Sequence, residues 1–389
     1  MTPVKPVYLD NAATSHPKPE AVYQAVTETL RSGGTSGRGA HQQTIAADRV
    51  VYETREALCG LFNGCDSSCF VFTPNATTAI NQALFGLLKP GDRVVTTSVE
   101  HNAVVRPLRQ LQDSGIDVVK VAADPVSGIV SPEILKTTCL EKLTRLLIVN
   151  HCSNVIGSIQ HLDGLGTWCR QQNIVFMVDG AQSAGSIPVD LQNLDIDLFA
   201  APGHKGLLGP QGTGFLYVRR GIELKPYILG GTGAHSHSDR QPAEYPERFE
   251  SGTLNLPGLA GLHAAINYVS QTGVAAIRHR ENELIERTLS GLRAISGVTI
   301  YGPESLADRG SAISFNLSSC DPAEVGFLLD QRDDILLRTG LHCAPDAHRT
   351  IGTLSSGGTV RVSPGYFTTD SEIDYFLEAV LRLTQRKFS

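Results

Sequence analysis

The sequence predicts an α/β protein in which a mostly parallel β-sheet is covered by helices. Short apolar runs rich in β-branched residues recur from about residue 69 to residue 201, and helix-length amphipathic segments separate them. Strands that alternate with helices in this way form parallel sheets buried on both faces. After residue 260 the pattern changes to two helices followed by several strands, which predicts a second, smaller α+β domain.

The expected elements follow from these runs in chain order. The parallel strands are expected at 69–73, 93–97, 117–121, 145–150, 174–179 and 197–201. Residues 212–218 follow a Gly-Pro turn and are expected to return as an antiparallel strand. In the second region we expect helices at 259–270 and 281–296, then strands at 298–302, 311–317, 335–340 and 359–367.

Length and composition restrict the classes of function. A chain of 389 residues exceeds the size at which one core stops growing, so a large and a small domain are expected. The net charge of −6 is spread without basic blocks, which argues against nucleic acid and membrane surfaces as partners. The sequence shows neither a signal peptide nor an apolar run of membrane-spanning length, and these features predict a cytoplasmic protein.

Cysteine and histidine spacing predicts neither a disulfide framework nor a metal site. The eight cysteines are scattered without a paired CxxC spacing. Two histidines alternate in HSHSD (235–239), but no carboxylate or cysteine cluster accompanies them, so a polar loop is the favoured interpretation and no metal is expected.

Polar residues that follow three predicted strands suggest where the chemistry lies. Asp179 ends an apolar strand, where a buried carboxylate is costly unless a cation such as a pyridinium nitrogen faces it. Lys205 follows the next strand in a glycine-rich turn, a position suited to covalent attachment of a carbonyl cofactor. Thr77 and Thr78 begin a helix whose amides could hold a phosphate, although a threonine pair is more often an ordinary cap.

With these motifs in order, the chain resembles the pyridoxal phosphate (PLP) enzymes of aminotransferase class V, within them the cysteine desulfurases and selenocysteine lyases with a short active-site loop. The resemblance runs nearly end to end. Its motifs are YLDNAAT (8–14), TPNATTAIN (73–81), SVEHNAVVRP (98–107), NHCSNVIG (150–157), VDGAQS (178–183), GHKGLLGPQGTG (203–214), RFESGTLN (248–255), RTGLHCAP (338–345) and VRVSPGYF (360–367).

The resemblance implies a fold type I transferase with a seven-stranded type of sheet. It also implies a division of the chain into an N-terminal segment, 1–20, that joins the small domain, a large PLP-binding domain, 21–260, and a small domain, 261–389. A homodimer is implied because Thr253 matches a threonine that the neighbouring subunit contributes.

The resemblance also implies roles for individual residues. Lys205 is similar to the lysine that holds PLP and moves the Cα proton, and Asp179 to the partner of the pyridine nitrogen. Further matches are Gln182 for the phenolic oxygen, His101 for ring stacking and proton shuttling, and Thr77, Thr78 and His204 for the phosphate. Asn154 matches an asparagine near the cofactor and the substrate carboxylate, Arg361 matches the arginine that binds that carboxylate, and Asn11 and Ala12 are expected to bind substrate. Pro202 departs from the pattern, because many relatives have serine there, so one phosphate hydrogen bond is expected to be missing or replaced.

Cys343 decides the predicted reaction. In RTGLHCAP it matches the cysteine that accepts sulfur, and His342 and Arg338 are candidates for the positive charge that favours a thiolate. The expected activity is conversion of L-cysteine to L-alanine with a persulfide on Cys343, which passes to a sulfur-acceptor protein or a reductant. Three alternatives stay open: a selenocysteine lyase, a C–S lyase acting on cystine or cysteine by β-elimination, and a PLP-binding regulatory protein without turnover.

Overall fold

The computed structural model describes residues 6–37, 39, 41–233, 238–318 and 320–386, and its larger part is built on one seven-stranded sheet. The strand order is β2-β8-β7-β6-β5-β3-β4, and all neighbours run parallel except β8, which is antiparallel to both of its neighbours. The strands are β2 (Phe70–Thr73), β3 (Arg93–Thr97), β4 (Asp117–Val121), β5 (Leu146–Asn150), β6 (Val175–Asp179), β7 (Leu198–Pro202) and β8 (Gly214–Val218). The predicted mostly parallel sheet and the antiparallel return are therefore confirmed.

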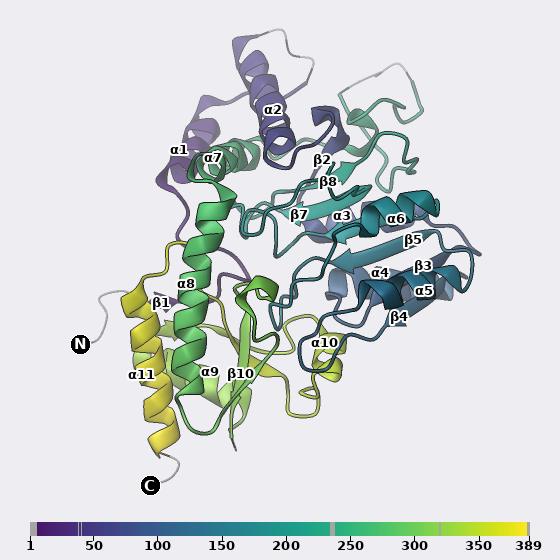
Figure 1. Ribbon diagram of the computed structural model, residues 1–389. Helices are drawn as coiled ribbons and strands as arrows, with labels where there is room; N and C mark the ends of the chain where they lie inside the picture. Colours follow the sequence, from purple (N-terminus) through teal and green to yellow (C-terminus); the bar gives the residue numbers. More distant parts are fainter. Residues whose placement is uncertain (1–5, 38, 40, 234–237, 319, 387–389) are drawn as a thin grey trace.

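Helices cover both faces of this sheet (Figure 1). On one face lie α3 (Ala76–Leu87) and α4 (Asn102–Asp113); on the other lie α2 (Gln42–Leu61), α5 (Pro132–Leu140), α6 (Leu165–Gln171) and α7 (Leu256–Thr272). Strand β5 shows the reason, since Leu146 and Ile148 pack with the first group while Leu147 and Val149 pack with the second. Alternate side chains of a strand point to opposite faces, so a strand buried on both faces must be apolar throughout.

The smaller part contains a four-stranded antiparallel sheet with the order β12-β13-β10-β9. Its strands are β9 (Val298–Tyr301), β10 (Ile313–Leu317), β12 (Arg338–Gly340) and β13 (Thr359–Val362). Helices α8 (Val274–Arg293), α9 (Pro322–Asp333) and α11 (Asp370–Arg386) pack on it, and α10 (Pro345–Thr350) follows β12. Three of these helices, α9, α10 and α11, were not among the predicted elements.

Two predicted strands of this part are wrong in extent. Residues 335–340 form two strands rather than one, because β11 (Ile335–Leu336) pairs with β1 (Val7–Tyr8) whereas β12 pairs with β13. The expected strand 359–367 ends at Val362, since Ser363 turns to bond the backbone of Leu9 and the following Pro364 has no N–H to donate. Both corrections depend on pairing with the N-terminal segment, which lies more than 300 residues away in the chain.

The N-terminal segment packs with the smaller part. Val7 and Leu9 belong to the same apolar cluster as residues of α8, α9 and α11, and Figure 1 shows β1 beside α11. The chain crosses between the two parts at Gly273, whose positive φ of 86° separates α7, which packs on α2 and on α1 (Glu20–Ser32), from α8. The predicted boundary at residue 260 lies inside α7, and the division into domains stays a prediction.

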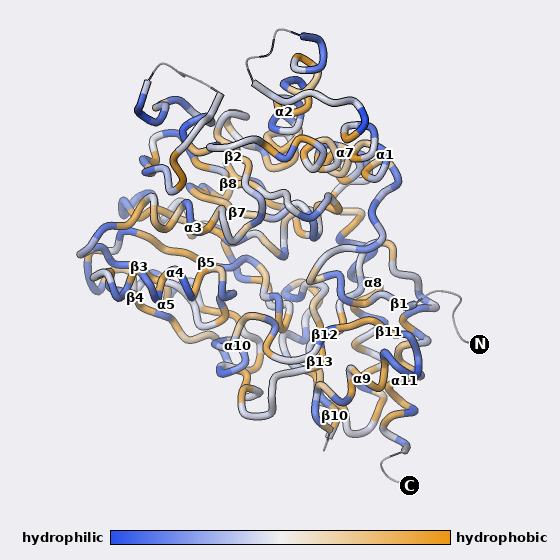
Figure 2. The backbone as a smooth tube through the Cα atoms, turned by 180° about the vertical axis from the view of Figure 1, so that it is seen from behind, coloured by the Kyte–Doolittle hydropathy of each residue, from blue (hydrophilic) through white to orange (hydrophobic). Residues whose placement is uncertain are grey.

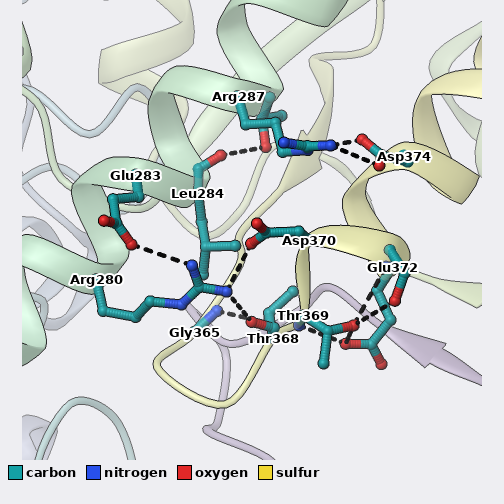
Figure 3. A network of polar contacts seen from close by, with 12 residues as sticks. Arg280, Glu283, Leu284, Arg287, Gly365, Thr368, Thr369, Asp370, Glu372 and Asp374 are labelled. Atoms are coloured by element: carbon teal, nitrogen blue, oxygen red, sulfur yellow. Dashed lines mark hydrogen bonds and ion pairs between the residues drawn. The ribbon is translucent and has the colours of Figure 1, made fainter.

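Helices α8 and α11 are joined by an ion-pair network on their exposed sides (Figure 3). Arg287 bonds both carboxylate oxygens of Asp374 at 2.6 Å, and Arg280 bonds Asp370 at 2.7 Å. Pairs as exposed as these add little stability, and the bidentate geometry of Arg287 and Asp374 mainly fixes the orientation of the two helices. Figure 2 shows mostly hydrophobic residues along β5, β7 and β8, whereas hydrophobic and hydrophilic residues alternate along α11.

Among the described residues, no helix is both long and apolar enough to cross a membrane. The predicted cytoplasmic location stays a prediction.

Candidate active site

The candidate site lies at the carboxyl edge of the main sheet, where open parallel sheets bind their ligands. A cavity of about 180 Å³ opens there. The predicted residues that line it are Thr77, His101, Asn154, Asp179, Gln182, His204 and Lys205, together with Pro202. They lie at or after the ends of five strands, β2, β3, β5, β6 and β7, so the parallel arrangement of these strands brings them together.

Lys205 and Asp179 form the chemical centre of this cavity. Lys205 is half-exposed because it borders the cavity, yet dense surrounding protein lowers the pKa of its amine to about 8, and the Asp179 carboxylate opposes part of this shift. Burial raises the pKa of Asp179, although its Oδ1 accepts the N–H of Ala181 at 2.9 Å. A neutral amine is a nucleophile toward carbonyl groups, so Lys205 is suited to hold PLP.

Asp179 provides the first test of whether the site fits PLP. Its side chain is buried at the end of β6, and within the described part of the chain it makes no ion pair. A buried carboxylate of this kind is stabilised by a cation placed opposite it, and a protonated pyridine nitrogen is such a cation. The residues present therefore fit the ring end of PLP.

The phosphate end of the site is formed by the start of α3 and by His204. Asn75 caps α3 by accepting the N–H of Thr78 at 2.9 Å, while Ala76 and Thr77 line the cavity. The first amides of a helix have no partner within the helix and attract anions. His204 also lines the cavity, and its buried Nδ1 has no hydrogen-bond partner among the described residues. Pro202 contributes neither a hydroxyl nor an N–H here.

His101 is held in one orientation at the start of α4. Its Nδ1 accepts the N–H of Ala103 at 3.0 Å, and burial, with Lys205 as a smaller cause, lowers its pKa to about 4. The imidazole is therefore neutral near pH 7, and since Nδ1 accepts a hydrogen bond, the proton lies on Nε2. That N–H is available to a group in the cavity.

Glu100, immediately before His101, is a site residue that the sequence reasoning missed. Its carboxyl is completely buried, and Oε1 accepts the hydroxyl of Thr97 at 2.6 Å and the N–H of Asn150 at 3.0 Å. Burial raises its pKa to about 8. Glu100 thus joins the ends of β3 and β5, and the only sequence signal was a charged residue three positions after the end of an apolar strand.

Replacing Glu100 with glutamine should remove a pH dependence of stability. Between pH 4.5 and about 8 the folded protein keeps a proton on Glu100 that the unfolded chain releases, so unfolding free energy falls as pH rises. The loss is about 1.4 kcal/mol per pH unit at most. In urea unfolding, the unfolding free energy of Glu100→Gln relative to that of the wild type should therefore increase from pH 5 to pH 8. A difference in unfolding free energy that is constant with pH would contradict a buried, protonated carboxyl.

Cys343 lies on a short loop between β12 and α10 that docks beside His101. The loop comprises residues 341–344, and the thiol-bearing residue is exposed. Its backbone carbonyl accepts the N–H of Asn102 at 2.8 Å, and the preceding carbonyl, of His342, accepts Nδ2 of Asn154 at 2.6 Å. His342 and Cys343 both have positive φ, 48° and 58°, which costs energy for residues with a Cβ and is often found at functional sites.

The expectation that His342 supplies positive charge near Cys343 is wrong. His342 is buried, and burial lowers its pKa to about 2, so the ring is neutral. Its Nε2 lies 3.2 Å from both the carbonyl and the hydroxyl of Thr359, and the ring therefore anchors the loop to β13. Arg338, which is exposed at the start of β12, remains the candidate cation of this motif.

Arg361 is buried on β13 and is already partly paired. Its Nη2 bonds Asp10 at 2.6 Å and its Nη1 bonds the carbonyl of Asn154 at 2.9 Å, while its buried Nε has no partner in the part of the chain that the structure describes. Asp10 also pairs with Arg338 at 3.3 Å. The sequence reasoning missed Asp10, which lies next to the predicted Asn11 in the YLDNAAT motif and neutralises part of this cationic cluster.

Besides Cys343 and Arg361, four more predicted residues do not line the cavity that contains Lys205 and Asp179. Thr78 and the exposed Thr253 line a separate cavity of about 240 Å³. Asn11 uses its amide to hold the N-terminal segment, since Nδ2 donates to Ser363 at 3.1 Å and Oδ1 accepts from His16 at 3.1 Å. Ala12 accepts Nε2 of Gln182 at 2.9 Å, so one of the two N–H bonds of Gln182 is already used.

No group of three histidine, cysteine or acidic residues arranged to hold a metal ion occurs in the described ranges. Residues 235–237 of the HSHSD segment lie outside those ranges.

An α/β fold with a cavity-lining lysine and a buried carboxylate at the carboxyl edge of its sheet defines a class of proteins suited to hold a carbonyl cofactor such as PLP. The chain belongs to the aminotransferase class-V family, whose model matches residues 7–376.

Several known proteins are similar to the chain along almost its whole length. It is 37% identical over 381 residues to a probable cysteine desulfurase of Methanothermobacter thermautotrophicus, covering 96% of this chain and 94% of the relative. It is 33% identical to a cysteine desulfurase of Pectobacterium atrosepticum, with 97% and 92% covered. The apo structure of a cysteine desulfurase from Thermococcus onnurineus superposes with a TM-score of 0.91 at 32% identity, covering 98% and 95%.

Proposed function

We propose that the protein is a PLP-dependent cysteine desulfurase that converts L-cysteine to L-alanine and takes the sulfur onto Cys343. The observation that carries this proposal is the position of Cys343: an exposed thiol on a strained loop, bonded through its backbone to the residue after His101. The charges of Cys343 and Arg361 are close enough to affect the pKa of Lys205. Cofactor binding alone requires neither the thiol nor the arginine.

In this proposal each residue has a defined task. When bound, PLP supplies an electron-poor ring that stabilises negative charge at the substrate Cα. Lys205 holds the cofactor and removes the proton from Cα, and Asp179 keeps the pyridine nitrogen protonated. Ala76, Thr77 and His204 hold the phosphate, and Arg361 binds the substrate carboxylate with the N–H groups that Asp10 and Asn154 leave free.

The sulfur transfer needs no outside oxidant. The Cys343 thiolate attacks the substrate sulfur, so the new S–S bond forms as the bond between Cβ and sulfur breaks. The electron pair of that bond goes to Cβ, and two protons are delivered to the carbon chain, one at Cβ and one at Cα. His101 can move a proton at the substrate sulfur through Nε2. Cysteine and a thiol thus give alanine and a persulfide, with every atom accounted for.

Two further parts of the proposal concern assembly. The exposed Thr253 lies apart from the Lys205 cavity of its own chain, as expected if it serves the site of a second copy in a homodimer. Light scattering of the PLP-bound protein measures this, and a monomer would contradict it. The persulfide would pass to an acceptor such as an iron–sulfur scaffold, a carrier protein or a small reductant, since Cys343, on which it forms, is exposed.

One assay separates the proposed activity from its alternatives. Pure protein is incubated with L-cysteine and dithiothreitol, and alanine, pyruvate and sulfide are measured together. Equal amounts of alanine and sulfide support a desulfurase, whereas pyruvate and ammonia would indicate β-elimination and overturn the proposal. Turnover of L-selenocysteine greatly exceeding that of L-cysteine would identify a selenocysteine lyase instead.

Replacing Arg361 with alanine should chiefly raise KM for L-cysteine. A charged bidentate pair contributes a few kcal/mol, so kcat/KM should fall by roughly 100-fold with a smaller change in kcat. Asp10 keeps Arg338 as a partner, and the variant is therefore expected to fold. Arg382→Ala, on the exposed side of α11, is the matched control. An unchanged KM would mean that another group holds the carboxylate.

A further inference from the structure

The carbonyl oxygen of His204, the residue before Lys205, accepts hydrogen bonds from the N-terminal segment. Its donors are the N–H of Ser15 at 3.0 Å, the hydroxyl of Ser15 at 3.1 Å, the hydroxyl of Thr14 at 3.2 Å and the ammonium of Lys18 at 2.9 Å. A carbonyl oxygen has two lone pairs, so these four donors saturate it. The N-terminal segment therefore holds the turn that carries Lys205 at this oxygen.

Lys18 is the charged member of this set, and its charge is not balanced by a carboxylate. Besides the His204 carbonyl it bonds the hydroxyl of Ser15 at 2.7 Å, and within the described ranges it makes no ion pair. Burial lowers its pKa to about 8. A half-buried cation held only by neutral oxygens is stabilised when an anion binds nearby.

The same charge acts on the ring of His204. That ring lines the Lys205 cavity with Thr77, and no described residue bonds its buried Nδ1. Burial, then Lys205, then Lys18 lower the pKa of His204 to about 4. Lys18 itself borders a different cavity, beneath the turn, and does not line the one that Lys205 faces. It can therefore influence a ligand there only through His204 and through its electric field.

We propose that Lys18 is a positioning residue for the phosphate end of the cofactor site: it anchors the His204–Lys205 turn through the His204 carbonyl and places an unbalanced positive charge behind His204. This inference rests on the proposed binding of PLP. The field favours the phosphate dianion, and the hydrogen bond fixes the ring of His204 and the backbone of Lys205. Two contributions, one of charge and one of geometry, are thereby assigned to one side chain.

The two contributions can be separated with a pair of ligands. Dissociation constants for PLP and for pyridoxal, which lacks the phosphate, are measured by equilibrium dialysis on the wild type, Lys18→Gln and Lys18→Arg. Glutamine keeps an N–H donor and removes the charge, whereas arginine keeps both. The control is Lys89→Gln, an exposed lysine after α3.

We expect Lys18→Gln to weaken PLP binding about tenfold, the size expected of one charge acting through a partly solvated site. The dissociation constant of pyridoxal should change by less than about twofold. In Lys18→Arg the ratio of the PLP and pyridoxal dissociation constants should return to the wild-type value, and Lys89→Gln should not alter this ratio. Equal changes for both ligands, or none in Lys18→Gln, would overturn the inference. A wild type that binds no PLP would instead overturn the proposed function.

Discussion

Cys343→Ser should abolish sulfur transfer while the protein still folds and binds PLP. The hydroxyl has nearly the size of the thiol but is hardly ionised near neutral pH, so it cannot attack the substrate sulfur. Loss of a covalent nucleophile lowers turnover by roughly 1,000-fold or more. The backbone bond from Asn102 to residue 343 does not involve the side chain, so the loop should keep its position.

Mass spectrometry gives the direct measurement for this variant. Wild type mixed with L-cysteine should gain one sulfur atom on the peptide that contains Cys343, and Cys343→Ser should gain none. Cys65→Ser is the control. Cys65 is also exposed, but it lies between α2 and β2, in the larger part of the protein. Full sulfide release by Cys343→Ser, with pyruvate as the carbon product, would show that no persulfide is needed.

Lys205→Ala should lose both the covalent cofactor and the activity. Lys205 is the lysine that lines the cavity at the edge of the sheet, and burial lowers the pKa of its amine to about 8, which increases the neutral fraction near pH 7. Alanine can neither bond PLP nor move the Cα proton, so activity should fall by at least about 1,000-fold. Borohydride treatment should fix PLP to the Lys205 peptide of the wild type.

Two outcomes bear on this assignment. Cofactor fixed by borohydride to another lysine in Lys205→Ala, with the wild-type yellow colour retained, would refute it. Lys89→Ala, the exposed control, should behave as wild type in both the spectrum and the activity.

The sequence by itself determined the main sheet and the residues at its carboxyl edge. Apolar runs predicted the seven strands within one or two residues at each end, because a strand buried on both faces tolerates few polar residues. Asp179 and Lys205 could be singled out because a charged residue directly after a buried strand has few explanations. Their shared cavity then follows from the parallel order of the strands.

Only the tertiary structure decided which side chains are charged and which distant residues and strands pair with each other. His342 was expected to be a cation, but burial against Thr359 leaves it neutral, and no local pattern reports burial. The break between β11 and β12 depends on which distant strand each one joins. The pairing of Arg361 with Asp10 joins residues 351 positions apart, and its strength depends on distance and burial, quantities that a linear sequence does not contain.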